Sequence, residues 1–319
     1  MHRDPASWFD AWVDAASGPD GFWTTESPAA HFQTASGFGP ELCHAVAALL
    51  SDRPDLRRVV EVGAGDGRLL TGLHHLRPDL RLVGVDLRSR PAGLSPGIGW
   101  CTDRWDVRTA RWTAEAAPQI LANLEPTLVL AVEWLDDLPC RLAAPAAGGW
   151  WELDVAGHPS TRLTQEDHQW IERWWPVGDR VEVGRTRDRA WSAMVGALTG
   201  VGGAALMVDY GHERASRPAA GSLASFRGGR SVAAVPAADR NLTAHVAVDA
   251  VQAAGERAGA RTVLRARQSR ALADLLPPPE GSTDPLQALA ARSRRRALTD
   301  GAGWGAHWWL LQEIAPAAL

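Results

Sequence analysis

The sequence predicts an α/β fold in which helices flank a mostly parallel sheet. Short apolar runs that end in glycine or acidic residues alternate with helical patterns between residues 57 and 211, and this alternation is typical of parallel strands joined by crossover helices. The 319 residues are 45% hydrophobic and 22% charged, which allows a large buried core. We therefore expect a main domain over residues 57–319, preceded by a helical extension over residues 1–56 that packs on it.

The N-terminal extension begins with MHRDPASWFDAWVDAAS, in which the tryptophans have helix-like spacing. This stretch lacks the uninterrupted apolar segment of a signal peptide, so it is predicted to be an amphipathic helix. A Gly-, Pro- and Ser-rich connection with several aromatic residues follows, and a second helix is expected over residues 40–52. No apolar run approaches the roughly 20 residues of a membrane helix. We therefore expect a cytoplasmic protein without membrane insertion.

Composition narrows the chemistry that the chain could perform. The three cysteines are far apart in the sequence, which favours neither a disulfide framework nor a thiolate zinc site. The sequence contains no lysine, so a lysine nucleophile is excluded. A formal net charge of -4 gives no general attraction to nucleic acid. The one basic cluster, RSRRR at residues 292–296, is interpreted as a solvated helix face.

The main domain is predicted to begin with a strand from residue 57, a glycine loop, a helix over RLLTGLHHL and a second strand that ends at Asp86. An insertion at about residues 140–200, with a hairpin strand at WWELDV, is interpreted as a substrate-side subdomain. Functional groups in such sheets gather at the carboxyl ends of the strands. The other expected elements are strands at residues 98–102, 126–134 and 204–211, a helix at residues 246–260, an arginine-rich helix and a closing apolar stretch, HWWLLQEI.

The loop VVEVGAGDGRLL follows the pattern E-x-G-x-G-x-G. A dinucleotide-binding loop requires G-x-G-x-x-G, and Arg68 occupies the position of its last glycine. An acid inside the strand, followed by glycines at every second position, is typical of methyltransferases that use S-adenosylmethionine (SAM), where bare backbone meets the cofactor. A tight turn without a ligand is the alternative interpretation. The predicted cofactor-binding residues of this loop are Glu61, Gly63, Gly65 and Gly67.

Two acids beyond the loop are also predicted to bind the cofactor. Asp86 ends the second strand, where its carboxylate could accept hydrogen bonds from ribose hydroxyls. NAD and SAM share that requirement, so the glycine pattern, and not Asp86, distinguishes them. Asp103 in WCTDRWD is predicted to bind the adenine amino group, with Trp100 or Trp105 as a flat apolar wall.

The fourth strand ends in VEWLDDLP, which places Glu133, Asp136 and Asp137 beside the predicted methyl donor. Methyl transfer from a sulfonium is an in-line displacement that mainly requires alignment of donor and acceptor and needs no metal. If the acceptor is a guanidine, carboxylates can orient its planar fork and take up its proton. Glu133 and Asp136 fit that task. Capping of a following helix is the alternative role for Asp137.

The fifth strand ends in VDYGH and contains Tyr210, the single tyrosine of a chain that has 16 tryptophans. Where tryptophan is the common aromatic residue, a lone tyrosine suggests that its hydroxyl is used. Asp209, His212 and His245, the last in NLTAHV, are plausible neighbours, and for each of them a satisfied structural polar group is the favoured alternative. The predicted catalytic residues are Glu133, Asp136, Tyr210 and His245.

These motifs together resemble one family. VEVGAGDGRL, VEWLDDLP, WWELDV, MVDYGH, GSLASF and NLTAHV follow the order seen in the MidA-like SAM-dependent methyltransferases, the family of a mitochondrial complex I assembly factor. Upstream, GFW and HFQTASGFGPEL are similar to family segments, and WWLLQEI extends the similarity downstream. The resemblance therefore covers almost the whole chain.

The resemblance implies a Rossmann-like methyltransferase fold with extra helical elements and SAM as the methyl donor. In the mitochondrial member it implies symmetric dimethylation of an arginine in a complex I subunit. The glycine loop and Asp86 would hold the cofactor, and the four predicted catalytic residues would face the substrate. The chain departs from the family pattern at four positions. The family usually has Asn where Val132 stands, Asp at the positions of Asn241 and Ala247, and Tyr at the position of Gln33.

Three functions stay open at this point. The leading prediction is a SAM-dependent protein arginine N-methyltransferase that acts on a partner protein. Methylation of a small metabolite is the second, and a SAM-binding assembly factor without turnover, suggested by the departures from the family pattern, is the third. Nucleic acid is not an expected partner. The tryptophan-rich insertion and N-terminal segment allow a lid or a homodimer surface.

Overall fold

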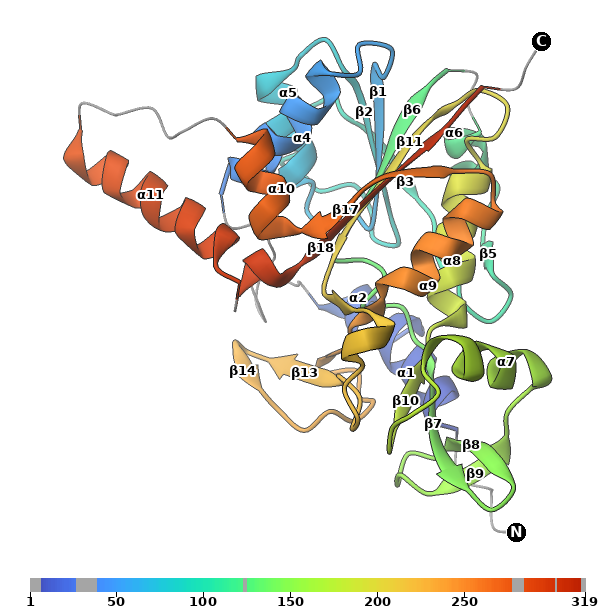
Figure 1. The fold of residues 1–319 in the computed structure, drawn as a ribbon. Helices are drawn as coiled ribbons and strands as arrows, with labels where there is room; N and C mark the ends of the chain where they lie inside the picture. Colours follow the sequence, from blue (N-terminus) through green and yellow to red (C-terminus); the bar gives the residue numbers. More distant parts are fainter. Residues whose placement is uncertain (1–6, 27–38, 123–124, 277–283, 302, 317–319) are drawn as a thin grey trace.

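A computed structural model describes residues 7–26, 39–122, 125–276, 284–301 and 303–316 (Figure 1). Within these residues the central sheet has seven strands in the order β17-β18-β11-β6-β1-β2-β3. All pairings are parallel except those of β18, which runs antiparallel to both of its neighbours. The prediction of an α/β fold with a mostly parallel sheet is confirmed. The strands are β1 (Arg58–Val62), β2 (Arg81–Asp86), β3 (Gly99–Thr102), β6 (Thr127–Val132), β11 (Gly203–Asp209), β17 (Arg261–Arg267) and β18 (Trp308–Ile314).

Helices cover both faces of this sheet (Figure 1). The central strands are buried on both faces, as their continuous runs of Val, Leu and Ala require. Alternate residues of each strand join two separate apolar clusters, for example Val59 on one side and Val60 on the other. One face is covered by α4 (Glu41–Ser51), α5 (Arg68–Leu76) and α10 (Gln268–Leu275), and the other by α6 (Ala116–Leu121), α8 (Arg185–Gly196) and α9 (Val248–Arg257).

The strand order reverses between β1 and β6. The chain proceeds from β1 outward to β2 and β3 on one side, and then resumes at β6 on the other. The loops that leave the two central strands therefore diverge and open a crevice at the carboxyl ends. Ligands bind at such a point in open α/β sheets, and both VEVGAGDG and VEWLDDLP lie there.

A second, antiparallel sheet lies beyond one end of the central sheet (Figure 1). Its strand order is β10-β7-β8-β9, and the hairpin strand expected at WWELDV is β8. The helix α8 returns to the central sheet, against which Trp191 and Met194 are buried. The separate layer therefore covers only the first part of the predicted insertion. Its elements are β7 (Arg141–Ala146), β8 (Gly149–Leu153), β9 (Pro159–Arg162), α7 (Gln165–Trp174) and β10 (Val181–Val183).

The N-terminal helices α1 (Trp8–Ser17) and α2 (Phe22–Thr25) pack between the two layers. The side chain of Ser7 caps α1 by accepting the Asp10 N–H. The indole side chains of Trp8 and Trp12 are buried in the cluster that contains Leu142. The predicted helix is therefore present from residue 8, whereas the family segment HFQTA, with Gln33, lies outside the described residues.

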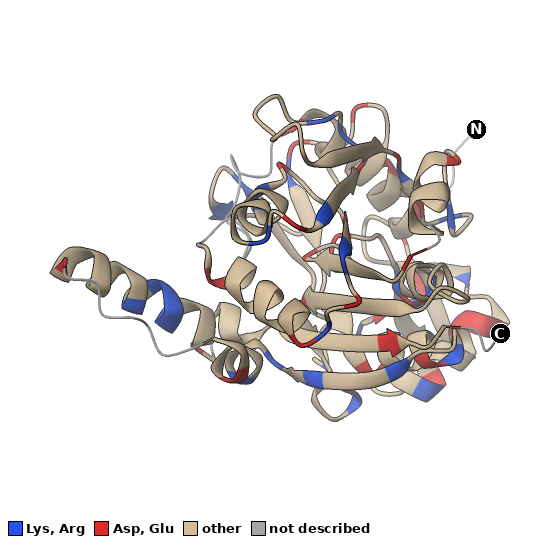
Figure 2. Ribbon diagram, turned by 90° about the horizontal axis from the view of Figure 1, so that it is seen from above, with Lys and Arg blue, Asp and Glu red and all other residues tan. Residues whose placement is uncertain are grey.

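Smaller elements complete the chain. Strand β17 was not predicted, because its arginines interrupt the apolar pattern of an edge strand. The arginine-rich helix α11 (Pro285–Thr299) projects from the body (Figure 2). Of the helices in the described part of the chain, none has the length and apolarity to cross a membrane. The remaining elements are β4 (Trp105–Asp106), β5 (Arg111–Trp112), β12 (Gly211–His212), η2 (Arg214–Ser216), β13 (Ala224–Arg227), β14 (Arg230–Ser231), β15 (Asn241–Thr243), β16 (Val246–Ala247) and η3 (Trp304–Ala306).

Candidate active site

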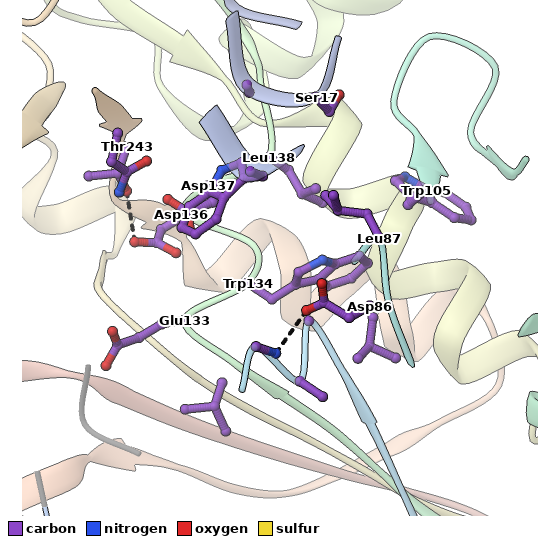
Figure 3. Close-up of a pocket in the computed structure, with 18 of the residues that line it drawn as sticks. Ser17, Asp86, Leu87, Trp105, Glu133, Trp134, Asp136, Asp137, Leu138 and Thr243 are labelled. Atoms are coloured by element: carbon purple, nitrogen blue, oxygen red, sulfur yellow. Dashed lines mark hydrogen bonds between the residues drawn. The ribbon is translucent and has the colours of Figure 1, made fainter. Parts of the chain in front are cut away.

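A cavity of about 540 Å³ opens at the crevice between β1 and β6. Its walls are the turns after β1, β2, β6 and β11, together with the N-terminal helices and the strands β13 and β15. All predicted site residues except Gly67 line this cavity. The fold therefore brings the predicted cofactor-binding residues and the predicted catalytic residues to one place (Figure 3). Their individual roles stay predictions. The lining residues that had been predicted are Glu61, Gly63, Gly65, Asp86, Asp103, Glu133, Asp136, Tyr210 and His245.

The glycine loop uses its three glycines in different ways. All three have left-handed backbones, with φ of 71° at Gly63, 61° at Gly65 and 73° at Gly67. A Cβ at Gly63 would lie 2.5 Å from Cδ1 of Trp134, whereas at Gly65 its nearest neighbour would be 3.7 Å away. Gly67 precedes α5 as its N-cap residue and packs on Leu94. Gly65 therefore leaves open space at the cavity, and Gly67 forms the turn into the helix.

Asp86 holds the glycine loop against the end of β2. Its Oδ2 accepts the Gly65 N–H at 2.8 Å (Figure 3). Its Oδ1 accepts the Arg88 backbone N–H at 2.9 Å and Nε–H at 3.2 Å. A carboxylate offers about four acceptor positions. Three are in use, which leaves one for a ligand hydroxyl, and a second becomes available if the Arg88 side chain moves.

Asp103 is engaged by its own loop. Its Oδ1 accepts hydrogen bonds from the Arg104 and Ala114 backbone N–H groups and from the Thr113 hydroxyl. Its Oδ2 accepts the Ala117 N–H at 3.2 Å. The carboxylate therefore holds the segment between β3 and α6 in place at the rim of the cavity. Its predicted contact with an adenine amino group stays a prediction.

Tryptophans form one wall of the cavity. Trp105 lines it, as expected for an apolar wall, together with Trp112 and Trp134. The rings of Trp112 and Trp134 are nearly parallel, with centroids 6.4 Å apart. Trp100 does not line the cavity, because its indole packs on Gly84 and donates its N–H to a backbone carbonyl. The cavity thus offers flat apolar surface close to the glycine loop.

Glu133 has a strained backbone at the end of β6. Its φ is +47°, in the left-handed region that non-glycine residues rarely occupy, and such strain is concentrated at functional sites. The Glu133 N–H still donates to the Val208 carbonyl at 2.8 Å, so the strand pairing continues up to this residue. Its Oε1 lies 3.2 Å from Nε2 of His307. Sequence reasoning missed His307, which stands at the start of an apolar stretch and belongs to no recognisable motif.

Asp136 and Asp137 form the acidic end of the cavity. Asp136 accepts the Thr243 hydroxyl at 2.7 Å (Figure 3). Burial raises the pKa of Asp136, and burial together with the neighbouring Asp136 raises the pKa of Asp137 well above its usual value. The Oδ1 atoms of both are buried and have no hydrogen-bond partner in the described parts of the chain. No helix follows Asp137, since the turn leads into β7, and the capping interpretation was therefore wrong.

Two buried groups hold the acidic turn from behind. The Oδ2 atom of Asp209 accepts the Leu135 N–H at 3.0 Å and the Asp136 N–H at 3.3 Å. The guanidinium of Arg187, which is 1% exposed, donates to the carbonyls of Asp136 at 2.7 Å, Leu138 at 3.1 Å and His245 at 3.0 Å. Arg187 thus joins two loops that are distant in sequence. Nothing in the helical pattern of α8 distinguished it from a surface arginine.

The rings of Tyr210 and His245 stack at the acidic end, with centroids 5.7 Å apart. Burial raises the pKa of Tyr210, so its hydroxyl stays protonated. Desolvation at the cavity, followed by the charge of Arg187, lowers the pKa of His245 to about 4 although the residue is exposed, which keeps the ring neutral at pH 7. Both side chains therefore act as neutral hydrogen-bonding groups beside the acids.

His212 does not line the cavity and is a structural polar group, as the alternative interpretation expected. It packs edge-on against Trp175, at a centroid distance of 4.7 Å, and its Nδ1 lies 2.6 Å from the Arg217 guanidinium. Burial, together with the Arg217 charge, lowers its pKa to about 2. His212 is therefore a neutral core residue between β12 and the second sheet.

The inserted sheet supports the site without lining it. No residue between 140 and 200 lines the cavity in the part of the chain that the structure describes. From β10, buried Glu182 accepts hydrogen bonds from the backbone and hydroxyl of Ser222, and the Ser222 hydroxyl accepts the His245 N–H at 2.8 Å. The insertion expected on the substrate side thus acts through the loop that carries His245. Across the described ranges, no group of three or more His, Cys, Asp or Glu residues could hold a metal ion.

Comparison with known proteins agrees with this geometry. Residues 101–266 match the family described as "Putative S-adenosyl-L-methionine-dependent methyltransferase". A Burkholderia thailandensis crystal structure, described as a "likely methyl transferase" bound to S-adenosyl-homocysteine, has 20% identity and a TM-score of 0.75, over 99% of this chain and 89% of that one. An uncharacterized protein from the same organism has 22% identity and a TM-score of 0.76 over the same shares. At these identities the likeness concerns the fold alone. No curated protein matches the sequence.

Proposed function

Because the chain belongs to this family of S-adenosylmethionine-dependent methyltransferases, we propose that its acceptor is a guanidinium group, the side chain of an arginine in a partner protein. The donor supplies an electrophilic methyl group carried on a sulfonium. What the chain itself must provide is a place for the donor, a place for the acceptor, and a group that takes up the acceptor's proton.

The glycine-loop end of the cavity fits the donor. Gly65 leaves open space beside an unused acceptor position of Asp86, as a ribose would need. The tryptophan wall at Trp105 and Trp134 offers apolar surface for a flat base. A cavity of about 540 Å³ lies within the range of small-molecule sites. We therefore assign the donor to this end.

The acidic end carries the proposal for the acceptor. Among the described residues, the buried Oδ1 atoms of Asp136 and Asp137 have no hydrogen-bond partner at this cavity, and the nearby guanidinium of Arg187 donates to backbone carbonyls. Burial raises the pKa of both acids, even though the charge of Arg187 acts to lower it. A planar cation placed among them would supply the missing donors, because a guanidinium offers five N–H groups in a fixed fork.

Methyl transfer to a guanidinium nitrogen also requires a base. A guanidinium has no free lone pair and must lose a proton as the new N–C bond forms. Glu133 lines the same cavity as Asp136 and Asp137 (Figure 3). We assign Glu133 as the base and the two aspartates as the groups that orient the guanidinium.

The proposal is tested with tritium-labelled SAM and lysate from cells that lack this protein. Wild-type protein is expected to label protein bands whose acid hydrolysate contains methylarginine, and Glu133→Gln is expected to label none. Glu313→Gln, which changes an acid at the far edge of the sheet, serves as the matched control. Label found only in small molecules would favour a metabolite acceptor. Donor binding without any transfer would favour an assembly factor.

A further inference from the structure

A second, open hollow adjoins the candidate active site. Its volume is about 420 Å³, and its lining residues are Tyr210, Ala297, Asp300, Gly303 and Trp304. Tyr210 also lines the main cavity, so one ring borders both spaces. The other four residues of the hollow have no part in the methyl transfer proposed above. Two of them, Ala297 and Gly303, are small and leave room for a ligand.

A buried glutamine fixes the walls of the hollow. Gln268, which is 0% exposed, donates from Nε2 to the carbonyl oxygens of Leu298 at 3.2 Å and Trp304 at 3.0 Å. It thereby joins the last turn of α11 to η3. Its Oε1 accepts the indole N–H of Trp309, on β18, at 3.1 Å. The hollow is therefore a formed feature of the fold, and its walls are tied to the central sheet.

The electrostatics of the hollow favour a cation. Asp300 is exposed and is the C-cap residue of α11, whose C-terminal end meets the body (Figure 1). A helix C-terminus carries partial negative charge, which favours a cation and disfavours a carboxylate. None of the described arginines of α11 lines the hollow. Arg294 instead pairs with Glu41, and Arg295 donates to the Leu276 carbonyl.

Trp304 adds an aromatic surface beside this carboxylate. An indole is the best aromatic partner for a guanidinium or ammonium group. The Trp304 side chain also makes a hydrogen bond to Tyr210, in which the tyrosine oxygen accepts, because an indole N–H can only donate. Trp304 is therefore in direct contact with the ring that borders the main cavity.

We propose that the hollow binds a second cationic side chain of the acceptor protein, an arginine or a lysine close in sequence to the arginine that is methylated. A single residue separates the hollow from the main cavity, and residues of an extended segment repeat about every 3.3 Å, so neighbouring side chains of one segment can fill both. The binding of a cation in the hollow does not depend on the proposed function, whereas its link to the methylated arginine rests on it.

Nitrogen-15 NMR of the indole groups tests the hollow by itself. In the full-length protein, Trp304→Phe identifies the Trp304 signal. We expect N-acetyl-L-arginine amide to shift this signal in a saturable way, and the neutral isostere N-acetyl-L-citrulline amide to leave it in place. Asp300→Asn should weaken this binding about 3- to 5-fold, whereas Asp284→Asn, at the opposite end of α11, should not change it. Equal shifts with both amides, no shift of Trp304, or a shift that Asp300→Asn leaves unaltered would overturn the proposal.

Methyl transfer to synthetic peptides tests the link to the acceptor. Peptides with one arginine among glycines are compared with peptides that carry a second arginine, a lysine or an alanine one or two positions to either side. At least one peptide with a second basic residue should have a KM about 3- to 10-fold below that of its alanine counterpart. The arginine and lysine peptides show which cation is preferred. Asp300→Asn should remove the difference without changing kcat or the affinity for S-adenosylhomocysteine.

The two experiments separate this proposal from the proposed function. Equal KM values for all methylated peptides would contradict the second cationic contact, while the proposed acceptor would stand. If no peptide is methylated although Trp304 responds to the arginine amide, the proposed acceptor is contradicted and the cation site in the hollow stands.

Discussion

The two ends of the cavity are built in different ways. At the glycine-loop end, Gly65, Asp86 and Arg88 come from consecutive elements of the chain, and their contacts use mostly backbone N–H groups. At the acidic end, Glu133, Asp136, Tyr210, His245 and His307 come from four separated segments of the sequence. The first end is a local motif, whereas the second exists only when the whole sheet has formed.

The ends also differ in electrostatic cost. Asp86 is also buried, but it is paired with Arg88, two residues further along the chain, so its charge is compensated locally. The acids of the other end are buried, and burial raises the pKa of Asp136 and Asp209. The charge of one buried guanidinium, that of Arg187, acts to lower the pKa of Asp136, Asp137 and Asp209 and so compensates these acids in part. The acidic end therefore depends on remote support in a way that the glycine-loop end does not.

Removal of the base is expected to have the largest effect and to separate the two ends most clearly. Glu133→Gln should lower the rate of methyl transfer by about 10²- to 10⁴-fold, because it removes a general base. Its affinity for S-adenosylhomocysteine should change by less than about threefold. Labelled turnover and calorimetric titration measure the two quantities. Equal losses in transfer rate and in S-adenosylhomocysteine affinity would mean that the two ends of the cavity are not functionally separate.

Removal of Arg187, which holds the acidic turn through backbone carbonyls, should destabilise the fold. Arg187→Met leaves the carbonyls of Asp136, Leu138 and His245 without this donor, and we expect the free energy of unfolding to fall by about 3–5 kcal/mol. Arg88→Met, at the largely buried pair of the other end, leaves Asp86 its two backbone N–H donors and should cost about 1 kcal/mol. Urea denaturation measures both. Similar losses for the two variants would contradict the asymmetry between the ends.

The stability of the folded protein should also depend on pH through Asp188, the neighbour of Arg187 in the chain. Burial raises the pKa of Asp188, next to Arg187 on α8, to about 7. The unfolded chain releases this proton near pH 4, so the folded state binds more protons between about pH 4 and 7. The free energy of unfolding should therefore fall as pH rises through this window, by at most about 4 kcal/mol from this residue.

Asp188→Asn removes that proton while keeping an acceptor for the Trp170 indole, which donates to Asp188 at 2.7 Å. The variant should match the wild type near pH 4 and be more stable at pH 8. Thermal or urea denaturation at several pH values provides the measurement. A variant less stable than the wild type by the same amount at every pH would show that Asp188 is ionised in the folded protein.

The smallest expected effect concerns the cofactor end alone. Asp86→Ala removes the acceptor of the Gly65 N–H and the predicted ribose contact, and should weaken binding of S-adenosylhomocysteine by about 10- to 100-fold, as for hydrogen bonds to a charged group. Asp79→Ala, which breaks an exposed ion pair with Arg77, is the matched control and should leave the affinity unchanged. Unchanged binding in Asp86→Ala would remove the basis for the ribose assignment.

Sequence reasoning succeeded where the chemistry is local. The glycine pattern and Asp86 are close in the chain and recur in a known order, and β1, β6 and β11 are apolar runs that burial on both faces requires. It failed for β17, where arginines at a sheet edge hide the strand.

By itself, the sequence determined the fold class, the glycine loop and the presence of acids at the strand ends, because these depend on periodicity and short spacing. Only the tertiary structure decided which acids are buried, that Arg187 supports their turn and that His307 faces Glu133. The physical reason is that charge state and pairing depend on burial and on atoms brought together from distant segments. Glu133 and His307 are separated by most of the second half of the chain, and no local pattern relates them.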